Sequence, residues 1–178
     1  LTLPGSALAY TENAAATVLD AGATVTDADS THFNGGVLIA SFTANGSVDD
    51  RLAIRNQGTG AGQIGVSGSN VTYAGVTIGS FAGGTDGSTP LTVTLNANAT
   101  VAATQALLRN ITYQNVSDAP STLARTVSLA LTDGSGGTSN TASKTINVTA
   151  VNDVPVITSD GGGAGAAVSA AENQAAVT

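Results

Sequence analysis

Acidic residues are the side chains best suited to chemistry in this sequence, because they are few and fall in short groups. The 178-residue chain has 12 Asp and Glu against 5 Lys and Arg, which gives a net charge of −7. The groups are Glu12-Asn13, Asp27-Ala28-Asp29, Asp49-Asp50, Asp133-Gly134 and Asn152-Asp153. Calcium takes about six to eight oxygen ligands from carboxylates, Asn side chains and backbone carbonyls. Because clustered carboxylates repel one another without a cation, the pattern favours a divalent-ion site.

The composition excludes several other kinds of site. The chain has no Cys, which excludes disulfides, thiolate metal ligands and thiol nucleophiles. It has a single His, His32, so paired catalytic histidines and His-rich metal sites are excluded. Five scattered basic residues are too few for a phosphate-binding stripe. We therefore expect no nucleic-acid partner. No apolar run approaches the roughly 18 residues of a transmembrane helix, so we expect no membrane insertion either.

The residue patterns of hydrolases are also missing. A glycoside hydrolase needs paired carboxylates in a cleft, usually beside aromatic residues that hold the sugar, and this chain has no Trp. A serine hydrolase would use His32 as its base, but no Gly-x-Ser-x-Gly motif is present. We therefore predict that the protein is not an enzyme.

The acidic groups lie between short segments in which apolar and polar residues alternate. Leu91–Leu95 and Thr126–Leu131 alternate with a period of two, which is typical of strands with one buried face. Turn-forming pairs such as Asn45-Gly46 and Asp133-Gly134 separate the segments. The expected strands are Ala23–Thr26, Val37–Thr43, Arg51–Arg55, Gln63–Val66, Asn70–Tyr73, Val76–Phe81, Leu91–Leu95, Asn110–Tyr113, Thr126–Leu131 and Ile146–Thr149. Many short strands with regular turns predict an all-β, antiparallel sandwich.

One segment departs from the strand pattern. Residues Thr100 to Arg109 contain helix-forming residues with apolar side chains at Val101 and Leu108, and Thr100 is a suitable N-cap. We predict a short helix here, crossing one end of the sandwich.

The end of the sequence resembles its beginning. Glu12-Asn13 follows an apolar approach and precedes small residues, and Glu172-Asn173 has the same surroundings. This pattern is typical of tandem repeats. We therefore predict one repeat over residues 1–155, followed at 156–178 by a linker and the first strand of the next repeat.

The order of these motifs resembles that of cadherin repeats. The sequence has Glu-Asn at 12, Asp-Ala-Asp at 27, strand-Asp-Gly at 133 and Asn-Asp-Val-Pro at 152. It is most similar to the cadherin-like and chondroitin-sulfate-proteoglycan-type repeats of large bacterial surface and secreted proteins. That group also has phrases similar to Thr104–Asn115 and to Leu131–Gly137. The resemblance covers Tyr10 to Pro155 and implies a Greek-key sandwich of cadherin or immunoglobulin type.

The resemblance implies a calcium site at one end of the sandwich. Asp27, Asp29 and Asp133, with the carbonyl of Asn34, would gather at the N-terminal end and meet the linker of the preceding repeat. Asp50 lies where cadherins have Asp-Arg-Glu, but Leu52 replaces the Glu, which leaves Asp50 a weaker ligand candidate.

A second group of ligands is implied at the other end. Glu12, Asn152 and Asp153 would gather there, beside the Asp-x-Asp of the following repeat. The linker has fewer acidic residues than the Asp-x-Asn-Asp-Asn of cadherins, so fewer ions per junction would follow.

Each of these residues also has a purely structural alternative. Asp27 and Asp29 fit a solvated turn with side chain to backbone hydrogen bonds, and Asp133-Gly134 fits an ordinary loop. Glu12 would discourage edge-to-edge pairing of strands, and Asn152-Asp153 would be a linker that ends at a proline.

The pattern as a whole favours a calcium-binding structural repeat of an extracellular adhesin or surface fibre. Calcium at each junction would rigidify the array, and extracellular calcium modules bind at about 10⁻⁴–10⁻³ M. Its partners would be neighbouring repeats or identical subunits, and a cell-surface protein or glycan. One alternative is a filament subunit that donates its C-terminal segment as a strand. Another is a calcium-dependent carbohydrate-binding module, although Tyr10, Tyr73 and Tyr113, the only tyrosines, lie in strands and favour packing.

Overall fold

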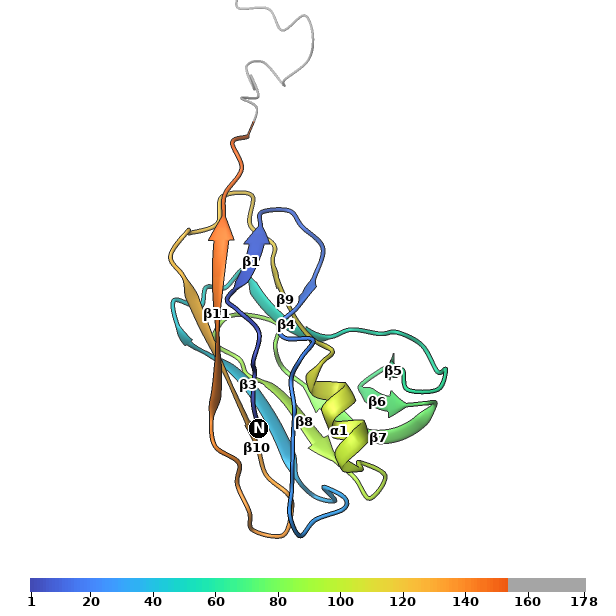
Figure 1. The fold of residues 1–178 in the computed structure, drawn as a ribbon. Helices are drawn as coiled ribbons and strands as arrows, with labels where there is room; N and C mark the ends of the chain where they lie inside the picture. The colour runs from blue at the N-terminus through green and yellow to red at the C-terminus, as the bar shows by residue number, and fades with distance from the viewer. Residues whose placement is uncertain (154–178) are drawn as a thin grey trace, which may run out of the picture.

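The computed structural model describes residues 1–153, which form a β-rich domain with one short helix (Figure 1). The elements follow the order β1 (Leu8–Thr11), β2 (Thr17–Val18), β3 (Val37–Ala44), β4 (Asp50–Ile54), β5 (Ile64–Ser67), β6 (Asn70–Tyr73), β7 (Val76–Ala82), β8 (Leu91–Leu95), α1 (Val101–Leu108), β9 (Ile111–Asn115), β10 (Arg125–Leu131) and β11 (Ala142–Thr149). The predicted linker and next strand, with Val154 and Pro155, lie outside the described residues. No helix within residues 1–153 is long and apolar enough to cross a membrane.

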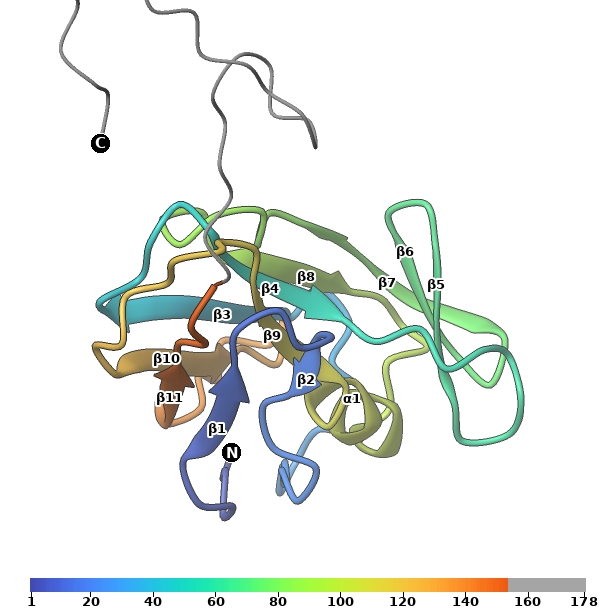
Figure 2. The ribbon, with the colours of Figure 1, turned by 90° about the horizontal axis from the view of Figure 1, so that it is seen from above.

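The strands form two sheets. An eight-stranded sheet has the order β1-β11-β10-β3-β8-β7-β6-β5, and a three-stranded sheet has the order β2-β9-β4 (Figure 2). All pairs are antiparallel except β1 and β11, which are parallel with Tyr10 opposite Val148. The prediction of a purely antiparallel fold is therefore wrong at this edge. An alternating pattern identifies a strand but not its partner, and here β1 pairs with β11, a segment about 138 residues further along the chain.

The alternation read from the sequence is present in the strands. In β11, Ala142, Lys144, Ile146 and Val148 are buried, while the residues between them are exposed. The β10 strand alternates in the same way, with Val127 and Leu129 buried. This period of two places one face of each strand in the core and the Thr and Ser face toward water.

The expected strands omit β1 and β2, and they include one segment, Ala23–Thr26, that is not a strand. Only Thr24 pairs there, through an isolated bridge to Thr2, although Ala23 and Val25 are buried. The segment therefore supplies apolar side chains to the core without joining a sheet, which an alternating pattern does not distinguish from a strand.

The predicted helix is confirmed. The hydroxyl of Thr100 accepts a hydrogen bond from the N–H of Ala103 at 3.1 Å, which caps the first turn of α1. Leu107 and Leu108 are fully buried, so the helix is held mainly by its apolar face.

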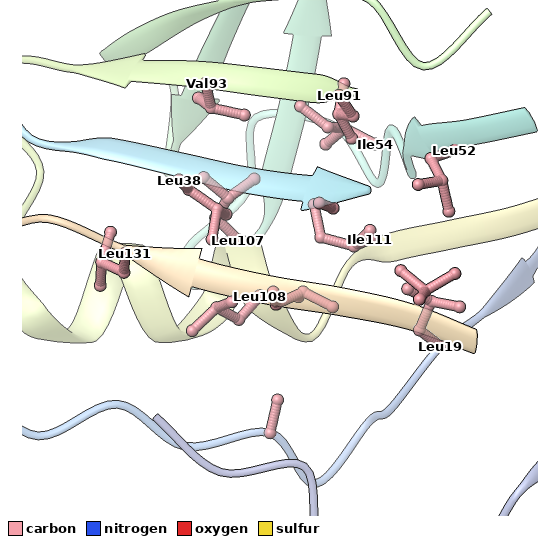
Figure 3. Packing of buried hydrophobic residues seen from close by; sticks show 14 of the residues in the cluster. Leu19, Leu38, Leu52, Ile54, Leu91, Val93, Leu107, Leu108, Ile111 and Leu131 are labelled. Atoms are coloured by element: carbon pink, nitrogen blue, oxygen red, sulfur yellow. The ribbon is translucent and has the colours of Figure 1, made fainter. Parts of the chain in front are cut away.

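The two sheets and the helix share one hydrophobic core (Figure 3). Leu38, Leu91 and Leu131 enter it from the large sheet, and Leu52 and Ile111 from the small one. Leu107 and Leu108 of α1 pack into the same cluster. This core fixes the loops at the two ends of the domain, which contain the acidic residues.

Candidate metal centre

Three of the predicted ligands meet at one end of the domain. Asp27, Asp29 and Asp133 each offer a carboxylate oxygen, and these three oxygens lie within 4.8 Å of one another. Asp27 and Asp29 belong to the connection between β2 and β3, and Asp133 to the connection between β10 and β11. The fold thus joins two loops that are separated by about 100 residues of sequence. Oxygens at this spacing can share one cation of the size of calcium.

The Asp27 loop is shaped by hydrogen bonds to a single carboxylate oxygen. Oδ1 of Asp27 accepts hydrogen bonds from the N–H groups of Asp29 at 3.1 Å and of Ser30 at 2.8 Å. The predicted turn is therefore present. Because both bonds use Oδ1, the turn occupies only one of the two oxygens of Asp27.

The Asp133 loop has the same design. Oδ1 of Asp133 accepts hydrogen bonds from the N–H groups of Ser135 at 2.7 Å and of Gly137 at 2.9 Å. The structural and metal-binding interpretations of Asp27 and Asp133 are thus compatible, since each turn orients a carboxylate and uses only its Oδ1.

A glycine allows the two loops to approach each other. Gly134 has φ of +81°, and a Cβ atom there would lie 2.0 Å from the carbonyl oxygen of Asn34. Only glycine is compatible with both conditions. The carbonyl of Asn34, the predicted backbone ligand, therefore lies against Gly134, the residue that follows Asp133. The group of oxygens close enough to share one ion consists of the three carboxylates.

The pKa values of Asp27 and Asp29 shift in opposite directions. A hydrogen bond with Asp27 and repulsion from it, with a further contribution from Asp133, raise the pKa of the Asp29 carboxyl. The backbone N–H groups of Ser30 and Asp29 lower the pKa of Asp27. The part of the rise in the pKa of Asp29 that comes from the charges of Asp27 and Asp133 is repulsive, and a cation would relieve it.

The carboxylates line a pocket of about 500 Å³. Its apolar wall includes Leu1, Phe33 and Leu131, and its polar wall includes Ser135 and Asn140. The N-terminal amino group of Leu1 donates to Oδ1 of Asn140 at 3.2 Å, and Nδ2 of Asn140 donates to the carbonyl of Leu1 at 3.0 Å. Leu1 is thereby held beside the candidate site.

Sequence reasoning missed the hydroxyl-bearing side chains of this pocket. Ser135, Thr138 and Ser139 line it from the β10–β11 connection. Their position shortly after Asp133 in the sequence could have predicted this, because the loop has to fold back toward that carboxylate.

Glu12 lies at the opposite end of the domain, where β1 and β11 both end (Figure 1). Only 4% of Glu12 is exposed. Its Oε2 accepts a 2.6 Å hydrogen bond from the N–H of Val151, while Oε1 is buried without a partner among the described residues. Asn152 and Asp153 follow directly and are exposed, with Nδ2 of Asn152 donating to the carbonyl of Asp153 at 3.2 Å. The hydrogen bond to Val151 thus brings Glu12 to the chain segment that continues into Asn152 and Asp153.

Asp50 has a different role from the one predicted. It is fully buried, and its Oδ1 accepts hydrogen bonds from the hydroxyl of Tyr113 at 2.6 Å and from Nδ2 of Asn115 at 2.7 Å. Its Oδ2 accepts from the N–H of Ser47 at 2.7 Å and lies 3.4 Å from Nε of Arg125. Burial opposes the charge, but these donors outweigh it and lower the pKa of Asp50. Since protein donors engage both oxygens, we remove Asp50 from the set of candidate ligands.

Comparison of the chain with protein-family models, with curated proteins and with solved structures finds no match.

Proposed function

We propose that this chain is a calcium-binding structural repeat of an extracellular adhesin or surface fibre. In this proposal, calcium ions at the ends of the domain rigidify a tandem array of similar domains. The Greek-key topology of cadherin or immunoglobulin type, which goes beyond a β-rich fold with two sheets, belongs to the same proposal.

One observation carries the proposal: the convergence of Asp27, Asp29 and Asp133 within 4.8 Å. Three carboxylates at this spacing repel one another, and this repulsion adds to the hydrogen bond with Asp27 that raises the pKa of Asp29. A fold that brings them together from two distant loops has a clear use for a divalent cation, which turns the repulsion into attraction. Oxygen-only ligands favour calcium or magnesium over transition metals. The loose, loop-based geometry favours calcium, because magnesium demands a near-ideal octahedron.

The second acidic group supports the array. Glu12, Asn152 and Asp153 lie where β11 leaves the domain, at the end opposite the three aspartates (Figure 1). In a head-to-tail array, this end of one domain would face the three aspartates of the next. Neither group alone supplies the six to eight oxygens, roughly, that calcium prefers, whereas the two together approach that number.

Thermal unfolding in chelator and then in rising calcium tests the proposal. Ligand at about 100 times its Kd stabilises the folded state by about 2.7 kcal/mol, which raises Tm by roughly 5–10 °C for a domain of this size. We expect a saturable rise with calcium and none with sodium at the same ionic strength. The Asp133→Asn variant should lose most of that rise while it keeps the Tm measured in chelator.

A matched control is available at Asp118, which is exposed and lies outside the three-carboxylate group. Asp118→Asn changes the net charge by the same amount and should respond to calcium as the parent chain does. A Tm that calcium leaves unchanged, both in this chain and in two joined copies, would overturn the proposal.

A further inference from the structure

A second pocket, of about 410 Å³, lies beside α1 and the segment that follows β4. It is separate from the acidic pocket, and no lining residue is shared between the two. Its polar wall consists of Arg55, Gln57, Tyr73, Gln105, Arg109 and Asn110. In Figure 1, α1 lies beside the part of the large sheet formed by β5, β6 and β7, away from the β1 edge.

Each of the two arginines of this pocket is anchored through its Nε atom alone. Nε of Arg55 donates to Oδ1 of Asn110 at 2.8 Å, and Nε of Arg109 donates to the carbonyl of Ala23 at 2.8 Å. The terminal Nη atoms of both guanidinium groups have no hydrogen-bond partner within residues 1–153. Each side chain is therefore anchored while its outer donors stay available.

The two glutamines of the pocket are likewise anchored by one side-chain atom each, the amide oxygen. Oε1 of Gln57 accepts from the N–H of Ile64 at 3.1 Å, and Oε1 of Gln105 accepts from the N–H of Val25 at 3.4 Å. An N–H group requires an acceptor, so these bonds fix which end of each amide is the oxygen. The NH₂ groups of both glutamines then remain as donors. Asn110 is engaged at both ends, since its Nδ2 donates to the carbonyl of Ala106 at 2.8 Å.

The result is a pocket wall with donors and no carboxylate. Among residues 1–153, no Asp or Glu lines it. The other cations are engaged differently: Arg125 pairs with Asp50, Lys144 pairs with Asp20, and Arg51 donates to the backbone carbonyl of Asp50. Two of the five basic residues thus line one pocket without a neutralising partner in the described part of the chain. Such a wall is complementary to an anionic group, which guanidinium forks bind with high geometric specificity.

Tyr73 adds a flat apolar surface to this anionic site. It is partly buried, it lines the pocket, and its ring is the only aromatic one there. A ring and amide donors beside two guanidinium groups suit a ligand that has a sugar ring, hydroxyl acceptors and one negative charge. The volume falls in the range of small-molecule sites, which is roughly 300–1,000 Å³.

We propose that this pocket binds an acidic saccharide, with Arg55 and Arg109 on its carboxylate or sulfate group and Gln57, Gln105 and Tyr73 on the sugar ring. The site is independent of the calcium proposal, because it contains none of the candidate calcium ligands.

Calorimetric titration of the full chain in chelator tests the proposal. The probes are trigalacturonate, its fully methyl-esterified and therefore uncharged form, and a sulfated galactose trisaccharide. We expect saturable binding of the first or third probe, weakening as salt is added, and at least about tenfold weaker binding of the methyl ester. The comparison of the first and third probes identifies the carboxylate or the sulfate as the preferred group.

Two variants locate the binding. Arg109→Gln should weaken it at least about tenfold, as expected for loss of a charge-assisted hydrogen bond, whereas Arg51→Gln, with the same charge change outside the pocket, should not. Gln105→Glu retains an acceptor for the N–H of Val25 but replaces the donor with a negative oxygen. It should abolish binding with Tm preserved, which separates loss of the site from loss of the fold.

Several outcomes would overturn the proposal. These are equal binding of the methyl ester or equal loss in Arg51→Gln and Arg109→Gln. The absence of saturation by either acidic saccharide up to about 10 mM would also overturn it, because a Kd of about 1 mM would already correspond to only about −4 kcal/mol. Trigalacturonate and triglutamate binding with the same affinity would also overturn it, because the pocket would then recognise any carboxylate.

Discussion

The N–H of Val151 donates a 2.6 Å hydrogen bond to Oε2 of Glu12 and so ties the exit of β11 to the end of β1. The two residues are 139 positions apart in the sequence. The same carboxylate keeps Oε1 buried without a partner among residues 1–153. A buried oxygen without a hydrogen-bond partner is energetically unfavourable, and a cation bound beside Asn152 and Asp153 would remove this cost.

Glu12 gives a prediction for joined domains. Glu12 and Glu172 set the period of the predicted repeat, so residues 1–160 followed directly by a second copy of the chain preserve that spacing. We expect Glu12→Gln in the first copy to weaken calcium binding at the junction at least about fivefold, since it removes one charged ligand. Calcium titration followed by small-angle scattering measures both affinity and extension.

The control is the same substitution in the second copy, where Glu12 lies away from the junction. An equal loss of junction affinity from both substitutions would contradict the role of Glu12 as a junction ligand.

Asp27→Asn separates the turn from the metal site. Asn retains a side-chain oxygen that can accept from the N–H groups of Asp29 and Ser30, so the turn should persist. It removes one of three charges, and we expect calcium affinity to fall at least about tenfold. The measurement is calorimetric calcium titration, with Tm in chelator as the check on the fold. Unchanged affinity would leave Asp27 with the turn role alone.

Calcium binding should depend on pH through Asp29. Its neighbours raise its pKa above the usual value of about 3.9, and calcium binds only the deprotonated form. Affinity should therefore be full above that raised pKa and fall as the pH drops through it. Titrations between about pH 7 and 4 measure this dependence. Asp29→Asn should bind calcium more weakly at neutral pH, and its calcium affinity should depend less on pH. The same pH dependence in Asp29→Asn and in the parent protein would contradict the assignment.

Asp50 is expected to act in stability and not in metal binding. Asp50→Asn leaves the buried guanidinium of Arg125 without its counter-charge, and breaking a buried pair costs about 3–5 kcal/mol. We expect this loss in chelator and in calcium alike, measured by urea unfolding. Asp49→Asn, at the partly exposed neighbouring position, should change the free energy of unfolding by less than about 1 kcal/mol.

The pKa of Asp50 predicts the direction of acid destabilisation. Because the pKa is lower in the folded state, the pair contributes stability above the unfolded value of about 3.9. That contribution is lost as the pH falls through the lower, folded value. The acid-dependent part of the unfolding curve should be smaller in Asp50→Asn, and an unchanged acid limb would assign the acid sensitivity to other groups.

The tyrosines illustrate how far a strand pattern predicts the role of a side chain. Tyr10 and Tyr113 are buried with their rings 4.9 Å apart, as a packing role predicts. Tyr73 also lies in a strand, yet it borders the pocket beside Arg55 and Arg109. Alternation decides which face a residue is on, but not whether a helix from elsewhere leaves a cavity over that face.

The sequence by itself determined most of the strands from β3 onward, the short helix with its Thr100 cap and the approximate places of the acidic loops. These features are local, because backbone preference and the period of apolar residues act over a few neighbours. Only the tertiary structure decided that Asp27, Asp29 and Asp133 meet, that Asp50 is buried against Arg125, and that β1 runs parallel to β11. Those relationships join residues about 75 to 140 positions apart, and they depend on how the two sheets close over one core.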